Sequence, residues 1–117
     1  MADIQRFDSN ARMSRVVIHN GVVYVAGVVA GDLSPDVAIQ TRDVLNSIDG
    51  YLAQAGTDKS RLLTAQIWLA DINRDFAALN EVWEAWADPA NMPTRATCEA
   101  RLGTPEMLVE IIVTAAL

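Results

Sequence analysis

The first third of the chain alternates short apolar runs with turn-forming residues, which is typical of antiparallel strands. Residues 14–19 and 22–29 predict two strands, and the Asn-Gly pair at 20–21 predicts a tight hairpin turn between them. An edge strand is expected over residues 4–7, and the apolar run at 62–69 predicts a further strand.

Two segments repeat apolar residues at helical spacing. The first follows a break at residues 31–35, so we expect Ser34 as its N-cap, Pro35 as its first helical residue and Gly56 as its end. The second is predicted over residues 75–87. Its apolar stripe favours core packing over a ligand cage and consists of Phe76, Leu79, Trp83 and Trp86.

Residues 93–117 predict a β-hairpin whose turn centres near Gly103, which would place position 95 opposite 110 or 111. Strand alternation then puts Arg95, Thr97 and Glu110 on one face and turns Cys98 toward the helices as a small core residue. A guanidinium beside a carboxylate suits the binding of a small acid and the activation of a neighbouring water molecule.

The predicted sheet has more apolar surface than two helices can cover. Two helices cover one face, yet residues 22–29 and 108–113 are apolar on both faces. Burying about 500 Å² of apolar surface per chain contributes roughly 12 kcal/mol before association costs. The sequence therefore predicts a stable homo-oligomer.

Composition narrows the class of protein. The 117 residues are 51% apolar and 21% charged, which predicts one globular domain over residues 1–117. A net charge of −6, with one lysine and scattered arginines, argues against nucleic-acid binding. The sequence has no apolar run long enough for a membrane span and no apolar stretch typical of a secretion signal. The single cysteine cannot form an internal disulfide, which is typical of a reducing compartment, so we expect a cytoplasmic protein. Since no apolar run is long enough for a span, we expect no membrane partner.

Several motifs together resemble one known family. Pro93-x-Arg95, followed fifteen positions later by Glu110, is similar to the signature of the RidA/YjgF reactive-intermediate deaminases. The similarity extends over nearly the whole chain, and segments 12–19 and 83–86 resemble the YoaB-like branch. The other matching segments are Asn20-Gly21, Val25-Ala-Gly27, Leu69-Ala-Asp71 and residues 75–83.

The resemblance implies a fold and an activity. It implies an α+β, chorismate-mutase-like domain with a mixed, mainly antiparallel sheet, two helices on one face, and a homotrimer with a site between each pair of subunits. Members hydrolyse enamines and imines such as 2-aminoacrylate to 2-oxo acids and ammonia, without a cofactor or metal. This chain would then be a hydrolase of the 2-iminobutanoate/2-iminopropanoate deaminase type, with a small carboxylate-bearing imine or enamine as substrate.

The resemblance also implies roles for particular residues. Arg95 would bind the substrate carboxylate and Glu110 would position the water, with Gly27, Thr97 and Asn80 completing the pocket. Arginine suits this role because its planar fork matches a carboxylate with two parallel bonds. Two positions depart from the family pattern: Thr97 stands where many members have cysteine, and Met13 stands where many have tyrosine. Met13 makes the pocket mouth more apolar and leaves the substrate preference open.

Other interpretations remain open at the sequence level. Arg95 and Glu110 also fit a structural cross-strand ion pair, and Gly27 also fits a strand bulge. The main functional alternative is a non-catalytic trimer that binds small acids, as a metabolite sensor or a holdase-like protein. The presence of both Arg95 and Glu110 favours the enzyme, because a carboxylate sensor needs only the arginine. The single histidine, His19, has no cluster of partners in sequence, so neither a metal site nor a serine triad is predicted.

Overall fold

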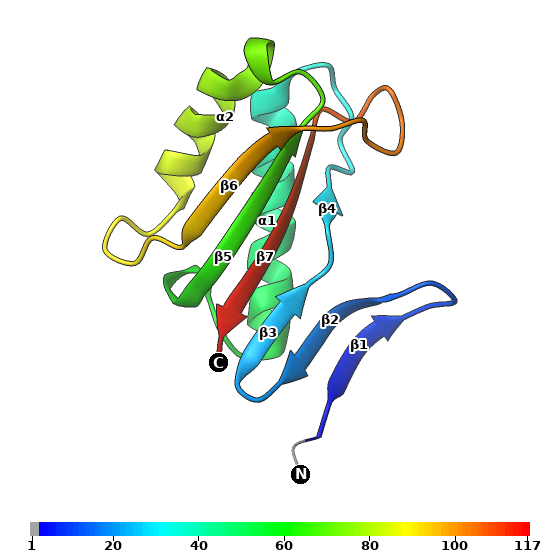
Figure 1. Cartoon of the computed structure of the whole chain (residues 1–117), viewed down its shortest axis with the longest axis vertical. Coiled ribbons are helices and arrows are strands. Elements are labelled where there is room, and N and C mark those ends of the chain that lie inside the picture. Colours follow the sequence, from blue (N-terminus) through cyan, green and yellow to red (C-terminus); the bar gives the residue numbers. More distant parts are fainter. Residues whose placement is uncertain (1–2) are drawn as a thin grey trace.

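Seven strands form one mixed sheet in the computed structural model, which describes residues 3–117 (Figure 1). Along the sheet the strands follow the order β1-β2-β3-β7-β5-β6, and the short β4 pairs with β7 beyond the end of β3. All pairs are antiparallel except β5–β6, which is parallel. The strands are β1 (Gln5–Ser9), β2 (Ser14–His19), β3 (Val22–Val25), β4 (Val28–Val29), β5 (Leu62–Leu69), β6 (Thr94–Glu99) and β7 (Val109–Ala116).

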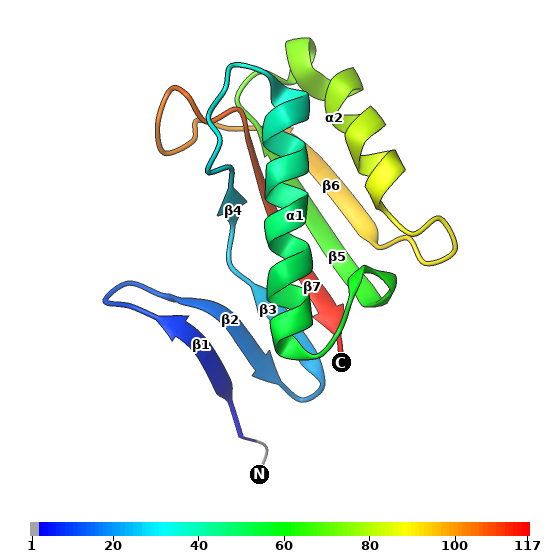
Figure 2. The ribbon, with the colours of Figure 1, turned by 180° about the vertical axis from the view of Figure 1, so that it is seen from behind.

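Two helices lie on the same face of this sheet, as Figure 2 shows from behind. They are α1 (Val37–Ala55) and α2 (Ile72–Trp86), and the short 3-10 helix η1 (Lys59–Arg61) precedes β5. This arrangement confirms the predicted α+β fold, with two helices on one face of a mostly antiparallel sheet. Among the described residues, no helix is long and apolar enough to cross a membrane.

The helix ends follow capping chemistry. Asp36 is the N-cap of α1, since its carboxylate accepts hydrogen bonds from the amides of Ala38 and Ile39. The predicted start at Ser34 and Pro35 was therefore wrong, and the Ser34 hydroxyl donates to Asp32 instead. Gly56 ends α1 as predicted, with a φ of 91° that favours glycine. The second helix begins three residues earlier than predicted, because Asp71 caps it.

Local patterns located most strands correctly. The strands at 14–19 and 62–69 have the predicted bounds, and the hairpin turn at Asn20-Gly21 has positive φ at both residues. The predicted strand over 22–29 is interrupted, because Ala26 and Gly27 bulge out between β3 and β4.

The predicted C-terminal hairpin was wrong. Strand β5 lies between β6 and β7, so these two strands do not pair with each other (Figure 1). Helix α2 connects β5 to β6 as a parallel crossover, and the segment 100–108 then passes over the end of β5 to reach β7. Backbone bonds fix this crossing, since Ala100 donates to the carbonyl of Leu69 and Ala70 donates to the carbonyl of Leu108, both at 3.0 Å.

The hydrophobic core lies between the helices and the sheet. Its strand residues point to the helical face at every second position, for example Val109, Ile111 and Val113 on β7. The opposite face is covered by neither helix, and Tyr24 on that face is 47% exposed. This helix-free face carries Val17, Val22, Tyr24, Val29, Thr64, Gln66, Trp68, Ala96, Cys98, Glu110, Ile112 and Thr114.

Candidate functional site

Arg95 lies on the edge strand β6 and points toward helix α2. It pairs with Ala65 of β5, which is buried on the helical face of the sheet. Its Nη2 donates a hydrogen bond of 2.7 Å to Oδ1 of Asn80 on α2. The guanidinium carbon lies 5.8 Å from the ring centre of Trp83 and 6.0 Å from that of Phe76. We call Arg95, Asn80, Phe76 and Trp83 the arginine cluster.

The arginine cluster leaves most of the guanidinium available for an anion. A guanidinium has five N–H donors, and Asn80 accepts from one of them. Within residues 3–117 Arg95 forms no ion pair, and its side chain is partly exposed. The aromatic rings and the Asn80 amide restrict the orientation of the fork without neutralising its charge. The cluster can therefore hold a carboxylate in a defined direction.

Thr97 lies two residues after Arg95 on β6 and on the same face of the sheet. It lies opposite the buried Ile67, and its Oγ1 is buried without a hydrogen-bond partner in the described part of the chain. An unsatisfied buried hydroxyl costs free energy that a bound ligand or water would recover. Thr97 thus lies on the same face as Arg95, as predicted.

Glu110 lies on β7 and faces the other way. Its strand partners are Trp68 on β5 and Val29 on β4, both on the helix-free face. Gly27 lies directly against its carboxyl group: a Cβ at Gly27 would be 3.1 Å from the carboxyl carbon and closer still to Oε2. No side-chain hydrogen bond to Glu110 occurs among residues 3–117, so the carboxylate remains free to accept one from water.

The prediction that Arg95 and Glu110 share a face was wrong. Arg95 pairs with Ala65, whereas Glu110 pairs with Trp68, and these β5 residues point to opposite faces. The physical reason is the inserted strand β5, which replaces the assumed direct pairing of β6 with β7. The alternative of an intramolecular cross-strand ion pair between the two residues is excluded by the same geometry. Cys98 is also exposed on the helix-free face rather than turned toward the helices.

Met13 joins neither group. It is in the loop between β1 and β2, where its amide donates to Oδ1 of Asn10 at 3.1 Å, and its side chain is 37% exposed. The predicted site residues therefore fall into two sets within one chain: Arg95 with Asn80 and Thr97, and Glu110 with Gly27.

The sequence did not identify Phe76 and Trp83 as neighbours of Arg95. Trp83 is buried as predicted, but Phe76 is 42% exposed at the edge of the sheet. The signal was available in the spacing of 76, 80 and 83, which places one polar and two aromatic side chains on a single helical stripe.

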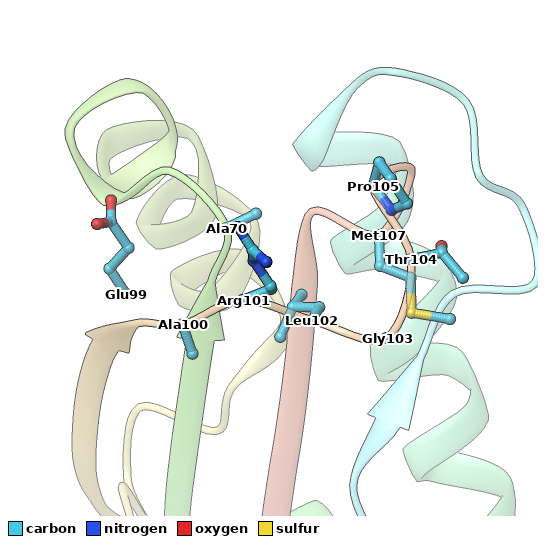
Figure 3. A pocket seen from close by; sticks show the side chains of 9 residues that line it. All are labelled: Ala70, Glu99, Ala100, Arg101, Leu102, Gly103, Thr104, Pro105 and Met107. Carbon is cyan, nitrogen blue, oxygen red and sulfur yellow. The ribbon is translucent and has the colours of Figure 1, made fainter.

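One cavity lies away from both sets of residues. It measures about 810 Å³ and is lined by Ala70 and by the segment that joins β6 to β7 (Figure 3). Glu99 at its rim accepts a hydrogen bond from the amide of Ile72 at the start of α2. Arg95 instead lines a smaller cavity of about 320 Å³ over β5 and β6. The larger cavity is lined mainly by a connecting loop and contains neither Arg95 nor Glu110. We therefore take the two sets of predicted residues, rather than this cavity, as the candidate site.

Comparison with known proteins identifies the family. The sequence pattern of the family described as Endoribonuclease L-PSP matches residues 3–117. A RutC family protein of Haemophilus ducreyi is 47% identical over 114 residues, covering 97% of each chain. The chain belongs to the RutC/YjgF family.

Further relatives support both the branch and the fold. The RutC family protein YoaB of Escherichia coli is 45% identical over 113 residues and covers 97% of each chain, which agrees with the resemblance to YoaB. A crystal structure of a YjgF family member from Neisseria meningitidis superimposes with a TM-score of 0.94 at 43% identity, covering 97% of this chain and 94% of that chain.

Two more distant members of the family have names that state an activity. A protein of Acinetobacter baylyi called 3-aminoacrylate deaminase RutC is 33% identical over 98 residues, 79% of this chain and 76% of its own. A protein of Rattus norvegicus called 2-iminobutanoate/2-iminopropanoate deaminase is 32% identical over 89 residues, 71% of this chain and 64% of its own.

Proposed function

We propose that this chain hydrolyses small carboxylate-bearing imines and enamines to 2-oxo acids and ammonia. The observation that carries the proposal is the arginine cluster, in which a partly exposed guanidinium is oriented by Asn80 and free of any carboxylate partner in residues 3–117. The deaminase names of the two distant relatives support the same reaction class.

The reaction needs few groups from the protein. Protonation of the enamine carbon gives an imine, whose C2 carbon is electrophilic enough for water to attack. Water adds to the C=N bond, a proton moves to nitrogen, and the C–N bond breaks to release ammonia and leave the 2-oxo acid. In this scheme Arg95 binds the substrate carboxylate, while Glu110 orients the water and carries the proton. Thr97 adds a hydroxyl beside the bound carboxylate, and Asn80 keeps the guanidinium in position.

Two copies of the chain are needed to bring these groups together. Arg95 and Glu110 point to opposite faces of one sheet, so a single chain cannot place both around one small substrate. Arg95 is on the edge strand β6, whose outer side pairs with no other strand in the described residues. Glu110 lies on the helix-free face, where uncovered apolar side chains favour contact with another protein surface. We therefore propose that Arg95 of one protomer meets Glu110 of the next in a closed ring, which the family resemblance makes a trimer.

A coupled assay tests the reaction. A pyridoxal-phosphate enzyme generates 2-aminoacrylate from serine, and the rate of pyruvate appearance is compared with and without the protein. We expect the wild type to accelerate pyruvate release, and Arg95→Ala and Glu110→Ala to remove that acceleration. If pyruvate appears no faster with wild type than with buffer, the non-catalytic reading, a protein that binds small acids, replaces this proposal.

Glu110→Ala distinguishes the two functions further. In both cases this variant should still bind carboxylates, because Arg95 is retained. Only in the enzyme should it lose an activity that the wild type has, since a protein that only binds small acids has no use for Glu110. Nuclease activity, which the family's description mentions, is not favoured here because the net charge of −6 opposes a polyanionic substrate.

A further inference from the structure

The sheet is interrupted beside Glu110 by a bulge at Ala26 and Gly27. Strand β3 ends at Val25, which pairs with Val16, and β4 begins at Val28, which pairs with Ile111. Neither bulge residue has a partner in the strand ladder, although the amide of Ala26 donates to the carbonyl of Arg15 at 2.9 Å. The Glu110 carboxyl group packs against the backbone of Gly27. The position of the bulge therefore determines where that carboxylate can lie.

Arg15 on β2 holds the carbonyl groups that the bulge leaves unpaired. Its Nη2 donates to the carbonyl of Gly27 at 3.1 Å and to that of Ala26 at 3.4 Å. Its guanidinium carbon is 5.1 Å from the ring centre of Tyr51 on α1. Its Nε is buried without a hydrogen-bond partner among residues 3–117. The guanidinium thus links the bulge to the helix layer, at the cost of an unsatisfied donor.

We propose that Arg15 is a positioning residue, which fixes the Gly27 bulge and through it the Glu110 carboxylate. The inference rests on the proposed function, in which Glu110 orients the attacking water. Loss of Arg15 frees two backbone carbonyls and removes the cation–π contact with the Tyr51 ring, so the bulge and the Glu110 carboxylate move together. The arginine cluster is unaffected, because its strand β6 is separated from β2 by β3, β7 and β5, and Arg15 contacts other residues.

This arrangement predicts a separation of kinetic parameters. In Arg15→Gln, kcat for 2-iminopropanoate should fall by about ten- to a hundredfold, since misplacing a reacting group by about 1 Å has an effect of that size. KM should change less than about twofold, because carboxylate binding by Arg95 is retained. Arg15→Lys should recover part of kcat, since an ammonium group can still donate to one carbonyl. Arg6→Gln is the matched control, because Arg6 is exposed on β1 and forms no side-chain bond in residues 3–117.

A structural readout separates this inference from the proposed function. Amide hydrogen exchange at Ala26, Gly27 and Val28 should accelerate at least about tenfold in Arg15→Gln and remain at wild-type rates in Arg6→Gln. Unchanged exchange at these amides, or an unchanged kcat in an active enzyme, would overturn the inference. An equal loss of activity and of assembly, with no separation of kcat from KM, would also overturn it. If the wild type lacks deaminase activity, the proposed function fails, and the exchange rates alone decide whether Arg15 fixes the bulge.

Discussion

At the scale of single residues, the candidate chemistry depends on two side chains whose surroundings differ. Arg95 is oriented by a hydrogen bond and by two aromatic rings, whereas Glu110 lies against a glycine and accepts no side-chain hydrogen bond within residues 3–117. A fixed cation and a free acceptor are suited to different tasks, namely gripping a substrate and handling water.

Replacement of Arg95 by lysine tests the importance of the planar fork. Lysine keeps the charge but loses one of two parallel bonds to a carboxylate, and a charge-assisted hydrogen bond contributes about 1.5–3 kcal/mol. We expect Arg95→Lys to lower kcat/KM for 2-iminopropanoate by roughly 10- to 150-fold, measured with the imine generated in situ. Arg42→Lys on the exposed surface of α1 serves as control. Wild-type kcat/KM in Arg95→Lys would mean that carboxylate orientation is unimportant.

Replacement of Gly27 by alanine tests the contact beneath Glu110. The added Cβ would overlap the carboxylate, and the flexible glutamate side chain can turn away at little cost in stability. We expect Gly27→Ala to lower kcat at least about tenfold while the thermal midpoint changes little. Gly50→Ala provides the control, because a Cβ there meets nothing within 4 Å inside α1. That control should retain activity and gain up to about 1 kcal/mol of stability. A fully active Gly27→Ala enzyme would contradict the assigned position of Glu110.

At the scale of elements, one buried amide joins three segments. Gln40 on α1 is fully buried, and its Nε2 donates to the carbonyls of Ser34 and Glu106, both at 2.9 Å. Its Oε1 accepts from the amide of Leu108 at 2.9 Å. These bonds fasten the segment before β7 to the start of α1, and they help to set where β7 begins.

Loss of this amide should destabilise the fold measurably. Gln40→Met keeps a similar shape but leaves the Glu106 carbonyl and the Leu108 amide without this partner, whereas the Ser34 carbonyl still accepts from the amide of Asp36. Each shielded backbone group left unpaired costs about 1–3 kcal/mol, so we expect the free energy of unfolding to fall by about 2 kcal/mol or more in urea titrations, with the slope unchanged. Thr57→Val is a comparison at one bond, since its hydroxyl donates only to the carbonyl of Ala116. Equal stability of Gln40→Met and wild type would show that water satisfies these groups.

The elements also show which parts of the fold the sequence could predict. Helices and hairpins depend on residues near in sequence, so the Asn20-Gly21 turn and the cap at Gly56 were readable. The partners of β6 and β7 depend on contacts across the whole domain, and no local pattern indicates that β5 inserts between them. Because β5 is inserted between β6 and β7, Arg95 lies on the opposite face of the sheet from the one predicted. The list of candidate residues is unaffected.

The same limit applies to the site. The family motif named Arg95, Asn80, Thr97, Glu110 and Gly27, and the structure gathers them into two sets. The sequence missed Arg15 because its importance comes from two backbone carbonyls, which leave no trace in residue identity. It treated Phe76 as core because helical spacing alone does not distinguish the core from the edge of a sheet.

At the scale of the whole molecule, one sheet face has helices and the other has none (Figures 1 and 2). The uncovered face carries Trp68 and Ile112 beside Glu110, with Tyr24 of β3 further along β7, while Arg95 lies at the sheet edge. A ring of identical copies in head-to-tail contact would cover apolar surface and unite the two sets in the same step. Assembly and activity are then linked, and an isolated protomer should be inactive.

Mixing two inactive variants tests this central claim most directly. Arg95→Ala and Glu110→Ala are each expected to be inactive, and they are unfolded together, refolded at equal amounts and checked for mixed assemblies by native mass spectrometry. A site that takes Arg95 from one copy and Glu110 from another is intact at about one interface in four, so activity should return to roughly a quarter of wild type. Mixed assemblies that remain as inactive as the separate variants would contradict a site shared between protomers.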